Sequence, residues 1–436
     1  MTMRFFYTLL IRCAVPFACA LILWRGLGDR GYRHGLAQRL GFGPRLRAPG
    51  IWVHAVSLGE MSAAAPLLRS LRSRYPAIPL VVTTATPAGK ARAQALLGAG
   101  ADVRFLAYDT PGSVRRFLAR IQPRAAIIME TELWPNLLGE CRRRRIPVLL
   151  ASARLSEKSA ARYLRFGSLF SGVFSGVFSG DLLVAAQTQS DAERFRSIGA
   201  AGAQVQVVGN VKFDVESEPG VLQKGHELRR SYGAHRPVWI GGSTHAGEDE
   251  QLLDAHALLQ RRQAGAVLLL VPRHKDRFAA VADLLARRGV KFARRSEMSA
   301  DAPLDASVPL DASVLLVDTV GELAALYASA DVAFVGGSLV PIGGHNLLEP
   351  AALGLPVLTG PSYFNGSEIA QLLLARGAAL QVGNAEELAQ ALLRLLEDAA
   401  ERERRGGIGR EIVAANRGSV ARLLALIEPW LPAHHP

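Results

Sequence analysis

Acidic side chains stand at the ends of two apolar stretches in the first half of the chain. Glu60 follows the stretch 51–56, and Glu130 and Glu132 stand at the end of the stretch 125–130. A carboxylate at a strand end can take a proton from a sugar hydroxyl, and paired carboxylates are typical of glycosyl chemistry. Two simpler interpretations remain open: Ser57-x-x-Glu60 has the pattern of a helix capping box, and the other two are charges favoured at a helix start.

A lysine follows another predicted strand end, and lysines are rare in this chain. Six of the 51 basic residues are lysines, and Lys212 lies in GNVKFD directly after the stretch 205–210. A cation at this position could stabilise negative charge on a departing phosphate. The alternative is a surface lysine whose stem covers apolar neighbours.

Glycine-rich loops follow apolar stretches in the second half. They are GGSTHAGE at 241–248 and GGSLVPIGGHNLLEP at 336–350, with Arg273 of VPRH at a further strand end. Backbone amides in such loops suit an anion. Thr319-x-x-Glu322 has the pattern of a capping box, and a ligand role is equally open. Together these loops predict a nucleotide site.

Several familiar catalytic motifs are missing from the sequence. It contains no P-loop, no dinucleotide-binding glycine motif, no H-E-x-x-H and no G-x-S-x-G. These absences argue against ATP hydrolysis, NAD chemistry, zinc proteolysis and serine esterase chemistry. The three cysteines have neither metal-ligand spacing nor an even number for a disulfide framework, which indicates a reducing compartment.

Short apolar stretches alternate with amphipathic helical patterns along the whole chain. This alternation predicts two doubly wound α/β domains, each with a parallel sheet covered on both faces. The predicted strands lie at 51–56, 80–86, 125–130, 147–153, 182–188, 205–210, 237–244, 266–274, 314–319, 331–338 and 355–361. Since ligands bind at the carboxyl ends of parallel strands, the loops after these strands should carry the function.

The first apolar segment, Phe5 to Trp24, is long enough to cross a bilayer. Its 20 residues reach about 30 Å at about 1.5 Å per helical residue. Four arginines follow between Arg25 and Arg39, without a cleavage site, which predicts an uncleaved anchor with a cytoplasmic flank. Arg12 is costly near the centre of a span. An interfacial helix and a core helix of the first domain are therefore alternatives.

Length and charge set wider limits. At about 100–200 residues per domain, 436 residues should form two sizeable domains, and 49% hydrophobic residues exclude a disordered chain. The formal net charge of +13 favours phosphates, carboxylates, an anionic membrane or nucleic acid. Genomic base bias is an alternative source of the arginines.

Ordered motifs across the chain resemble those of the 3-deoxy-D-manno-octulosonic acid (Kdo) transferases of lipopolysaccharide synthesis. The resemblance covers nearly the whole chain, including the N-terminal anchor. It implies a GT-B fold, with two facing Rossmann-like domains, and transfer of Kdo from CMP-Kdo to the lipid A precursor (lipid IVA) on the cytoplasmic face of the inner membrane. The motifs are HAVSLGE, ETELWPN, ASARLS, GNVKFD, GGSTHAGED, VPRH, DTVGEL and GGSLVPIGGHNLLEPAALGLPVLTGP.

The resemblance also implies roles for residues that match the family's motifs. Glu60 would be the general base, and Glu130 and Lys212 would assist the transition state. Family members often have Met where Val320 stands, and a backbone contact would tolerate that change. The residues implied to bind CMP are Pro272, Arg273, Val320, Gly321, Glu322, Asn346, Leu347, Leu348 and Glu349.

We expect an inverting transfer that needs no cofactor and no metal, because no DxD-like acidic pair occurs in the second domain. The expected partners are CMP-Kdo, the lipid A precursor and inner-membrane lipids, with no nucleic acid. Predicted boundaries are an anchor at 1–25, an acceptor domain at 26–212, a donor domain at 213–410 and a C-terminal helix at 411–436 that packs back across the interface. The number of Kdo residues added is left open.

Two other functions remain as alternatives. A UDP-sugar transferase or epimerase would use the same twin-domain frame, because a fold alone does not fix the sugar. A basic membrane-associated protein that binds nucleic acid or anionic lipid would explain the charge and the anchor. It would leave the glycine-rich loops without a role, and the chain has no aromatic-interleaved basic motif for RNA.

Overall fold

The computed structural model describes residues 2–28, 35–165, 178, 181–214, 220–233, 235–298 and 312–431. Arg30 and Arg33, two of the predicted anchor-flanking arginines, lie outside these residues. The chain divides into two compact units. Unit 1 comprises Met1–Asp214 with Asn416–Pro436, and unit 2 comprises Val215–Ala415.

Unit 1 contains a seven-stranded sheet in the order β3-β2-β1-β4-β5-β6-β7. Every neighbouring pair is parallel. The central strands are buried throughout, so their apolar residues serve two cores, one on each face of the sheet. The strands are β1 (Ile51–His54), β2 (Leu80–Thr84), β3 (Asp102–Phe105), β4 (Ala125–Met129), β5 (Val148–Ala153), β6 (Leu182–Ala186) and β7 (Val205–Val207).

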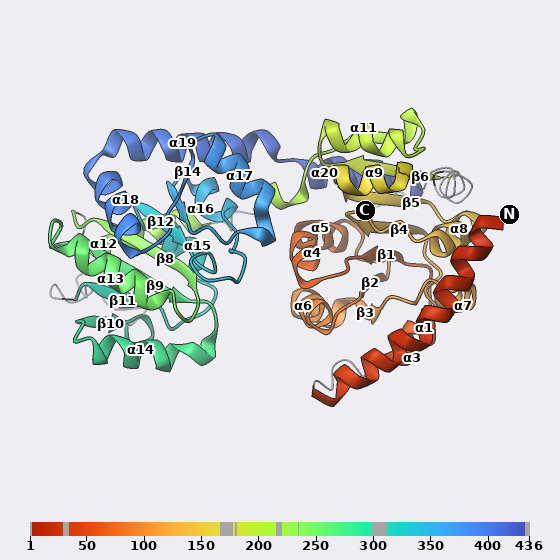
Figure 1. Cartoon of the computed structure of the whole chain (residues 1–436), viewed down its shortest axis with the longest axis horizontal. Coiled ribbons are helices and arrows are strands. Elements are labelled where there is room, and N and C mark those ends of the chain that lie inside the picture. Colours follow the sequence, from red (N-terminus) through yellow and green to blue (C-terminus); the bar gives the residue numbers. More distant parts are fainter. Residues whose placement is uncertain are drawn as a thin grey trace. The chain divides into compact units, whose positions relative to one another are not determined.

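Helices cover both faces of this sheet, as Figure 1 shows. Those whose residues join one core are α7 (Pro111–Ile121), α8 (Pro135–Arg143), α9 (Glu157–Arg165) and α11 (Gln189–Ser197). The helices whose residues join the other core are α4 (Leu58–Ala63), α5 (Ala65–Arg74), α6 (Pro87–Leu97) and α20 (Ser419–Ile427). The short α3 spans Leu36–Arg39, and the 3₁₀ turn η3 spans Val211–Phe213.

The C-terminal helix α20 completes the core of unit 1. Its Leu423 and Ile427 are fully buried against residues from the first half of the chain. Asp214 fixes the start of this helix, because its carboxylate accepts the N–H of Gly418 at 2.6 Å and that of Val420 at 2.5 Å. Residues more than 200 positions apart in sequence therefore belong to one folded unit.

Unit 2 repeats the architecture with the strand order β10-β11-β9-β8-β12-β13-β14, again all parallel. Its strands are β8 (Val238–Thr244), β9 (Val267–Pro272), β10 (Phe292–Arg294), β11 (Val314–Leu316), β12 (Val332–Val335), β13 (Val357–Thr359) and β14 (Ala379–Gln381). Its helices are α12 (Val221–Ser231), α13 (Asp249–Gln260), α14 (Phe278–Arg287), α15 (Leu323–Ala328), α16 (Leu348–Leu353), α17 (Ser367–Ala375), α18 (Ala385–Glu397) and α19 (Ala399–Asn416).

Each sheet has a point near its centre at which the strand order reverses. The order reverses between β1 and β4 in unit 1, and between β8 and β12 in unit 2. The loops that leave two adjacent strands diverge at such a point, which opens the crevice where α/β sheets bind ligands. The candidate residues of each unit should therefore be sought in the loops after these strands.

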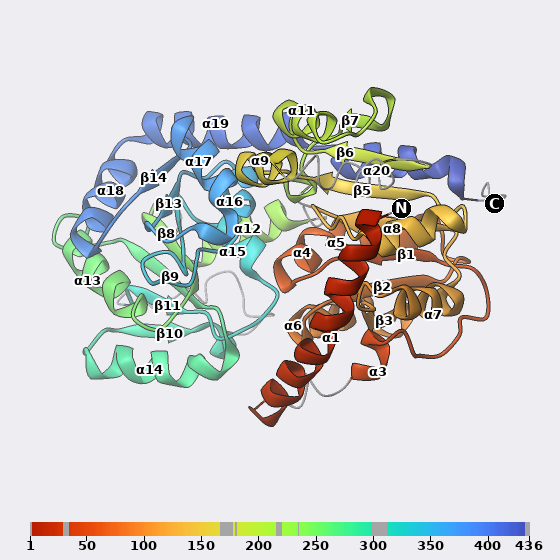
Figure 2. The same cartoon turned by 45° about the vertical axis from the view of Figure 1, so that its right-hand side comes forward.

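The N-terminal helix α1 (Thr2–Gly28) runs along unit 1 in both views (Figures 1 and 2). Tyr7 donates a hydrogen bond to Asp109 Oδ2 at 2.8 Å, and Thr8 donates one to Asn136 Oδ1 at 3.2 Å. The opposite face exposes large apolar side chains, with Phe17 at 77% and Trp24 at 67%. Phe5–Gly28 is apolar enough to cross a membrane, and none of its most apolar window is buried. The core-helix interpretation is therefore wrong.

Candidate active site

Glu60 lies at the reversal point of unit 1, in the first turn of α4 after β1. The predicted cap is present, because the Ser57 side chain accepts the Glu60 N–H at 3.3 Å. The Glu60 carboxylate in turn accepts the Val56 N–H at 2.8 Å and the Ser57 hydroxyl at 3.2 Å. Burial raises the pKa of Glu60 from 4.5 to about 7, and the charges of Glu130 and Glu132 add to the rise. A carboxylate with this pKa can accept a proton near neutral pH.

Glu130 and Glu132 follow β4, the strand next to β1 across the reversal point. Glu130 has a φ of 55°, a left-handed conformation that is uncommon outside glycine, and its N–H bonds the Ala151 carbonyl at 3.0 Å. Burial raises the pKa of Glu132, whose carboxylate accepts the Trp134 indole N–H at 2.5 Å. The structure thus brings the predicted acidic residues of unit 1 together.

Lys212 reaches the same group from η3. Its Nζ lies 3.8 Å from Glu130 Oε1, and about a third of each side chain is exposed. This ion pair therefore connects Lys212, which follows β7, to Glu130, which follows β4. The snorkelling interpretation does not account for a lysine directed at a partly buried carboxylate.

A buried polar chain that we did not predict holds the backbone before Lys212. Gln187 donates to the Ser152 carbonyl at 2.9 Å and accepts the Asn210 side-chain N–H at 3.0 Å. Asn210 then accepts the Lys212 N–H at 3.0 Å. Ser152 has a φ of 52° and lies where the β5–β6 register shifts. Strained backbone of this kind often marks a functional site.

In unit 2, the glycine-rich loops after β8 and β12 do hold an anion, but the anion belongs to the chain. Glu248, which is fully buried, accepts the N–H groups of His245, Gly337, Ser338 and Leu339 at 2.7–3.0 Å. Burial raises its pKa, whereas these four donors favour the ionised form. These four amides are therefore already bonded within the chain, and the expectation that the glycine-rich loops bind an anionic ligand stays a prediction for the rest of each loop.

Arg273 and three histidines lie around the same loops. Arg273 is exposed after Pro272, the buried last residue of β9, and its N–H bonds the Thr244 carbonyl at 3.0 Å. His245 and His345 face each other with 2.7 Å between their Nε2 atoms, and the His274 ring lies 5.5 Å from that of His245. Burial lowers the pKa of His345 to about 4, and the charge of Arg273 acts in the same direction.

The predicted CMP-binding residues after β12 form the start of α16. Asn346 donates to Glu349 Oε1 at 3.1 Å and accepts the Leu348 N–H at 3.1 Å. Burial raises the pKa of Glu349, and the nearby charge of Arg273 partly offsets this rise. Because the Leu347 and Leu348 side chains are buried, only their backbone is available to a ligand.

The loop after β11 carries Val320, Gly321 and Glu322. The predicted capping box is wrong, because α15 begins at Leu323 and places Glu322 at the N-cap instead of in the first turn. The Glu322 carboxylate accepts the Thr319 hydroxyl and pairs with Arg295 at 2.8 Å. Val320 is exposed, and Gly321 has a φ of 92°. The backbone of this loop is therefore available to a ligand at the carboxyl edge of the sheet, where β9 and β8 also end.

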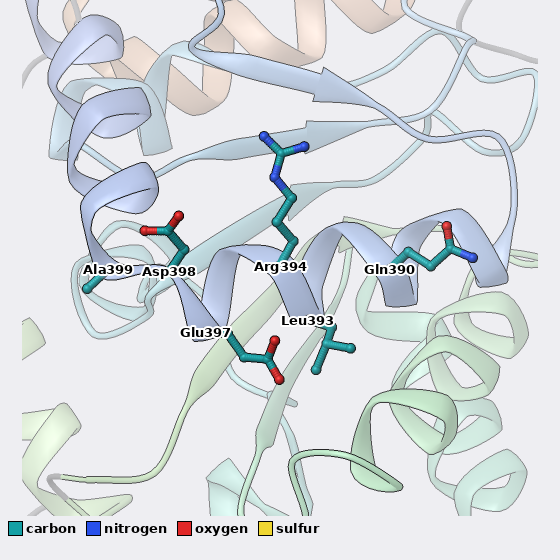
Figure 3. Close-up of a pocket in the computed structure, with 6 residues that line it drawn as sticks. All are labelled: Gln390, Leu393, Arg394, Glu397, Asp398 and Ala399. Carbon is teal, nitrogen blue, oxygen red and sulfur yellow. The ribbon is translucent and has the colours of Figure 1, made fainter.

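Two further observations delimit the candidate sites. In the described part of the chain, no three His, Cys, Asp or Glu residues are arranged to hold a metal ion. A surface pocket of unit 2 on α18 and the start of α19 contains none of the residues above, and Figure 3 shows its charged side chains pointing in different directions. Its lining residues are Gln390, Leu393, Arg394, Glu397, Asp398 and Ala399.

Comparison with known proteins agrees with the division of the chain into two units. Residues 34–215 match the family described as 3-deoxy-D-manno-octulosonic-acid transferase (kdotransferase), and residues 305–412 match glycosyl transferases group 1. The 3-deoxy-D-manno-octulosonic acid transferase of Haemophilus influenzae is 40% identical over 98% of this chain and 99% of its own. That of Bordetella pertussis is 37% identical over the same shares.

A solved UDP-GlcNAc 2-epimerase from Neisseria meningitidis has a TM-score of 0.55 at 13% identity, covering 88% of this chain and all of its own. At this identity the likeness concerns the fold alone. The fold is of the GT-B type, with two Rossmann-like doubly wound α/β units and an apolar N-terminal helix. With relatives that match from end to end, the chain belongs to the 3-deoxy-D-manno-octulosonic acid transferase family and is a glycosyltransferase of lipopolysaccharide biosynthesis.

Proposed function

We propose that the enzyme transfers Kdo from CMP-Kdo to lipid IVA with inversion at the anomeric carbon. Kdo is a 2-keto sugar acid, so the reacting carbon is C2. The acceptor hydroxyl oxygen forms a bond to C2 while the bond from C2 to the phosphate oxygen breaks. The hydroxyl proton passes to Glu60, and CMP leaves with the bonding electron pair. A single displacement needs a base on the acceptor side and no covalent enzyme intermediate.

The observation that carries this proposal is the environment of Glu60. Its pKa of about 7 combines with a position at the reversal point beside Glu130 and Glu132. A cap alone does not require a raised pKa, because the Val56 N–H favours the ionised carboxylate and by itself lowers the pKa of Glu60. In the proposed reaction Glu130 and Lys212 assist the transition state, and their 3.8 Å pair places opposite charges at the same strand ends.

On the donor side, the residues proposed to bind CMP lie on the loops after β11, β9 and β12. These strands are close neighbours in the order β11-β9-β8-β12, so their carboxyl ends share one edge of the sheet. Arg273 would meet the phosphate, because a guanidinium presents several donors to phosphate oxygens. The loop 320–322 and the segment 346–349 would contact the nucleotide on either side of Arg273.

Two substitutions separate the base from the cap. Glu60→Gln retains an acceptor for the Val56 N–H but cannot take a proton, so kcat should fall at least about 100-fold. Ser57→Ala removes the cap oxygen at a cost of about 1 kcal/mol in stability and should retain most of the activity. Initial rates with CMP-Kdo and lipid IVA, with thermal unfolding as the control, measure both. A folded Glu60→Gln enzyme with near-normal turnover would exclude Glu60 as the base.

The proposal also includes catalysis without a divalent cation. Arginine, lysine and backbone groups would meet the departing phosphate, so the purified enzyme should keep its activity in EDTA. Complete loss in EDTA that Mg²⁺ restores would contradict this. Replacing CMP-Kdo by UDP-sugars in the same assay tests the alternative GT-B reactions, and mass spectrometry of the product gives the number of Kdo residues added.

We further propose that the enzyme acts on the cytoplasmic face of the inner membrane, with α1 lying in the interface. A span places the two ends of the helix about 30 Å apart along the membrane normal. Tyr7 and Thr8, near the first end, instead bond to unit 1. The less exposed residues recur on one side of the helix, at Tyr7, Ile11, Val15, Ile22 and Gly26. An exposed apolar face opposite a protein-facing stripe suits a helix that lies flat.

A further inference from the structure

Glu248 is a buried carboxylate at the start of α13 that has no place in the proposed chemistry. It has no exposed surface. Oε2 accepts the His245 N–H at 3.0 Å and the Gly337 N–H at 2.7 Å, and Oε1 accepts the Ser338 and Leu339 N–H groups at 2.9 Å each. Each oxygen thus faces two N–H donors, and these four contacts provide no acceptor for a carboxyl proton.

The four donors belong to two different loops. The His245 N–H lies after β8, and the other three lie after β12, the adjacent strand across the reversal point. The start of the β12 loop also packs directly on the end of β8, because the Gly336 N–H bonds the Gly242 carbonyl at 2.8 Å and a Cβ at Gly336 would lie 2.5 Å from the Ser243 carbonyl oxygen. Glu248 is therefore the side chain that ties the two loops together from within.

These loops carry His245 and His345 to their contact. The His345 N–H bonds the Gly336 carbonyl at 3.2 Å, and the Gly344 N–H bonds the Gly337 carbonyl at 2.7 Å, so the loop folds back on the segment that Glu248 holds. The two imidazole rings are nearly parallel, with 2.7 Å between Nε2 atoms. Arg273, on the neighbouring β9 loop, is near enough for its charge to act on both histidines.

We propose that Glu248 is a positioning residue of the donor site, a built-in anion that fixes the loops after β8 and β12 and thereby sets His245 and His345 beside Arg273. The amides of Gly337, Ser338 and Leu339 are then occupied before any donor arrives. The phosphate and carboxylate of the donor are met by the arginine and the imidazoles, which sit on the scaffold that Glu248 shapes. This inference rests on the proposed CMP-Kdo site in unit 2.

Glu248→Gln tests the positioning role, with Asp331→Asn as the matched control. A glutamine turns its NH₂ group toward two N–H donors and cannot satisfy all four. Asp331 lies at the amino end of β12, the opposite edge of the sheet, where it accepts the Val238 N–H at 2.8 Å and pairs with Arg229 at 2.9 Å. Its loss should destabilise unit 2 without altering the donor loops.

We expect Glu248→Gln to raise the KM for CMP-Kdo at least about tenfold and to leave the KM for lipid IVA unchanged. Asp331→Asn should lower the unfolding temperature but keep the donor KM within about twofold of wild type. A folded Glu248→Gln enzyme with a normal donor KM would overturn the proposal. An equal rise in donor KM for Asp331→Asn would overturn it as well, because general destabilisation would then suffice.

Hydrogen exchange of the wild-type enzyme gives an independent test that does not depend on how the variant folds. The amides of Gly337, Ser338 and Leu339 should exchange slowly without nucleotide, and added CMP should not slow them further. Rapid exchange that CMP suppresses would mean that these amides bind the nucleotide directly, which contradicts the proposal. If CMP does not bind at all, the proposed donor site fails, whereas slow exchange at these amides still supports the role of Glu248.

Discussion

Glu60 serves two purposes with one carboxylate. It closes the start of α4 through Val56 and Ser57, and it sits beside two other acidic residues that oppose its ionisation. The cap orients the Glu60 carboxylate, whereas burial and the two neighbouring acidic residues raise its pKa. The helix-cap and catalytic interpretations, which the sequence leaves as alternatives, are therefore compatible in the folded protein.

This arrangement predicts a pH-dependent cost in stability. The folded pKa of Glu60, about 7, lies above its ordinary value of 4.5, so the folded state binds more protons than the unfolded state between these values. The contribution of Glu60 to the free energy of unfolding is therefore highest below pH 4.5 and falls as the pH rises to 7. Glu60→Gln removes this pH-dependent loss of stability, because glutamine does not titrate.

We expect Glu60→Gln to stabilise the enzyme by about 1 kcal/mol more at pH 8 than at pH 4, a value reduced from the full shift because Glu60 is partly exposed to solvent. Denaturant unfolding of wild type and variant at both pH values measures this difference. The Ser57→Ala enzyme is the control, and its stability difference from wild type should vary less with pH. A pH-independent effect of Glu60→Gln would show that its carboxylate is not held protonated.

At the scale of elements, the carboxyl ends of the strands carry the candidate residues. Glu130 after β4 and Ser152 in β5 both have positive φ angles, at 55° and 52°. The bulge at Ser152 turns its carbonyl to Gln187 and its hydroxyl to the Val211 N–H, at 3.4 Å. Adjacent strands thus end in strained conformations that aim polar groups toward Lys212.

Gln187 links Ser152 of β5 to Asn210, which precedes Lys212. Removing the Gln187 side chain should therefore disturb Lys212 indirectly. Gln187→Ala breaks the bonds to Ser152 and Asn210, which should destabilise unit 1 by about 1–2 kcal/mol and lower kcat several-fold. The KM for CMP-Kdo should stay the same, because Gln187 lies in unit 1. Gln189→Ala, two residues away on exposed surface, is the matched control. An unchanged kcat in Gln187→Ala would separate this polar chain from catalysis.

Alternating apolar stretches predicted eleven of the strands, and all eleven are present. The three that were missed, β3, β10 and β14, are edge strands of three or four residues. An edge strand has one neighbour and needs fewer apolar residues, and β3 contains both Asp102 and Arg104. Short edge strands of mixed composition therefore leave little periodic signal.

Part of the candidate site was also predictable. Glu60, Glu130 and Lys212 were found because each follows an apolar strand, and the topology of unit 1 brings them together. Gln187 and Glu248 were missed as supporting residues, because all their partners except His245 lie 23–91 positions away and depend on bulges and loop shapes. A glycine-rich loop signals an anion but does not tell whether the anion is a ligand or a side chain.

At the scale of the whole molecule, α1 is the proposed membrane anchor, since it is long and apolar enough to cross a membrane. Between Phe5 and Leu27 its exposed side presents large apolar side chains, whereas its other side bonds to Asp109 and Asn136. Asp109 also accepts the Asn136 and Leu137 N–H groups at the start of α8, the helix after the Glu130–Trp134 loop. The proposed anchor thus lies next to a segment of the proposed acceptor side.

Thiol labelling can distinguish a flat helix from a spanning one. In a background with Cys13→Ser and Cys19→Ser, we introduce Thr2→Cys at one end of α1 and Gly28→Cys at the other. With an interfacial helix, a membrane-impermeant maleimide should label both positions to the same extent in sealed proteoliposomes. Gly28→Cys is the control, because it reports how many molecules face outward. Protection of Thr2→Cys alone, relieved by detergent, would indicate a span.

The burial of α20 in unit 1 also dictates an order of events during protein synthesis. Unit 2 is one continuous stretch, Val215–Ala415, and the ribosome completes it before it makes α20. Unit 1 begins first, but its core lacks Leu423 and Ile427 until the last residues emerge. Domains generally fold as units as they are synthesised. The half of the enzyme encoded first is therefore the half that is finished last, and a nascent chain that ends between α19 and α20 would carry a complete unit 2 together with a unit 1 whose core lacks α20.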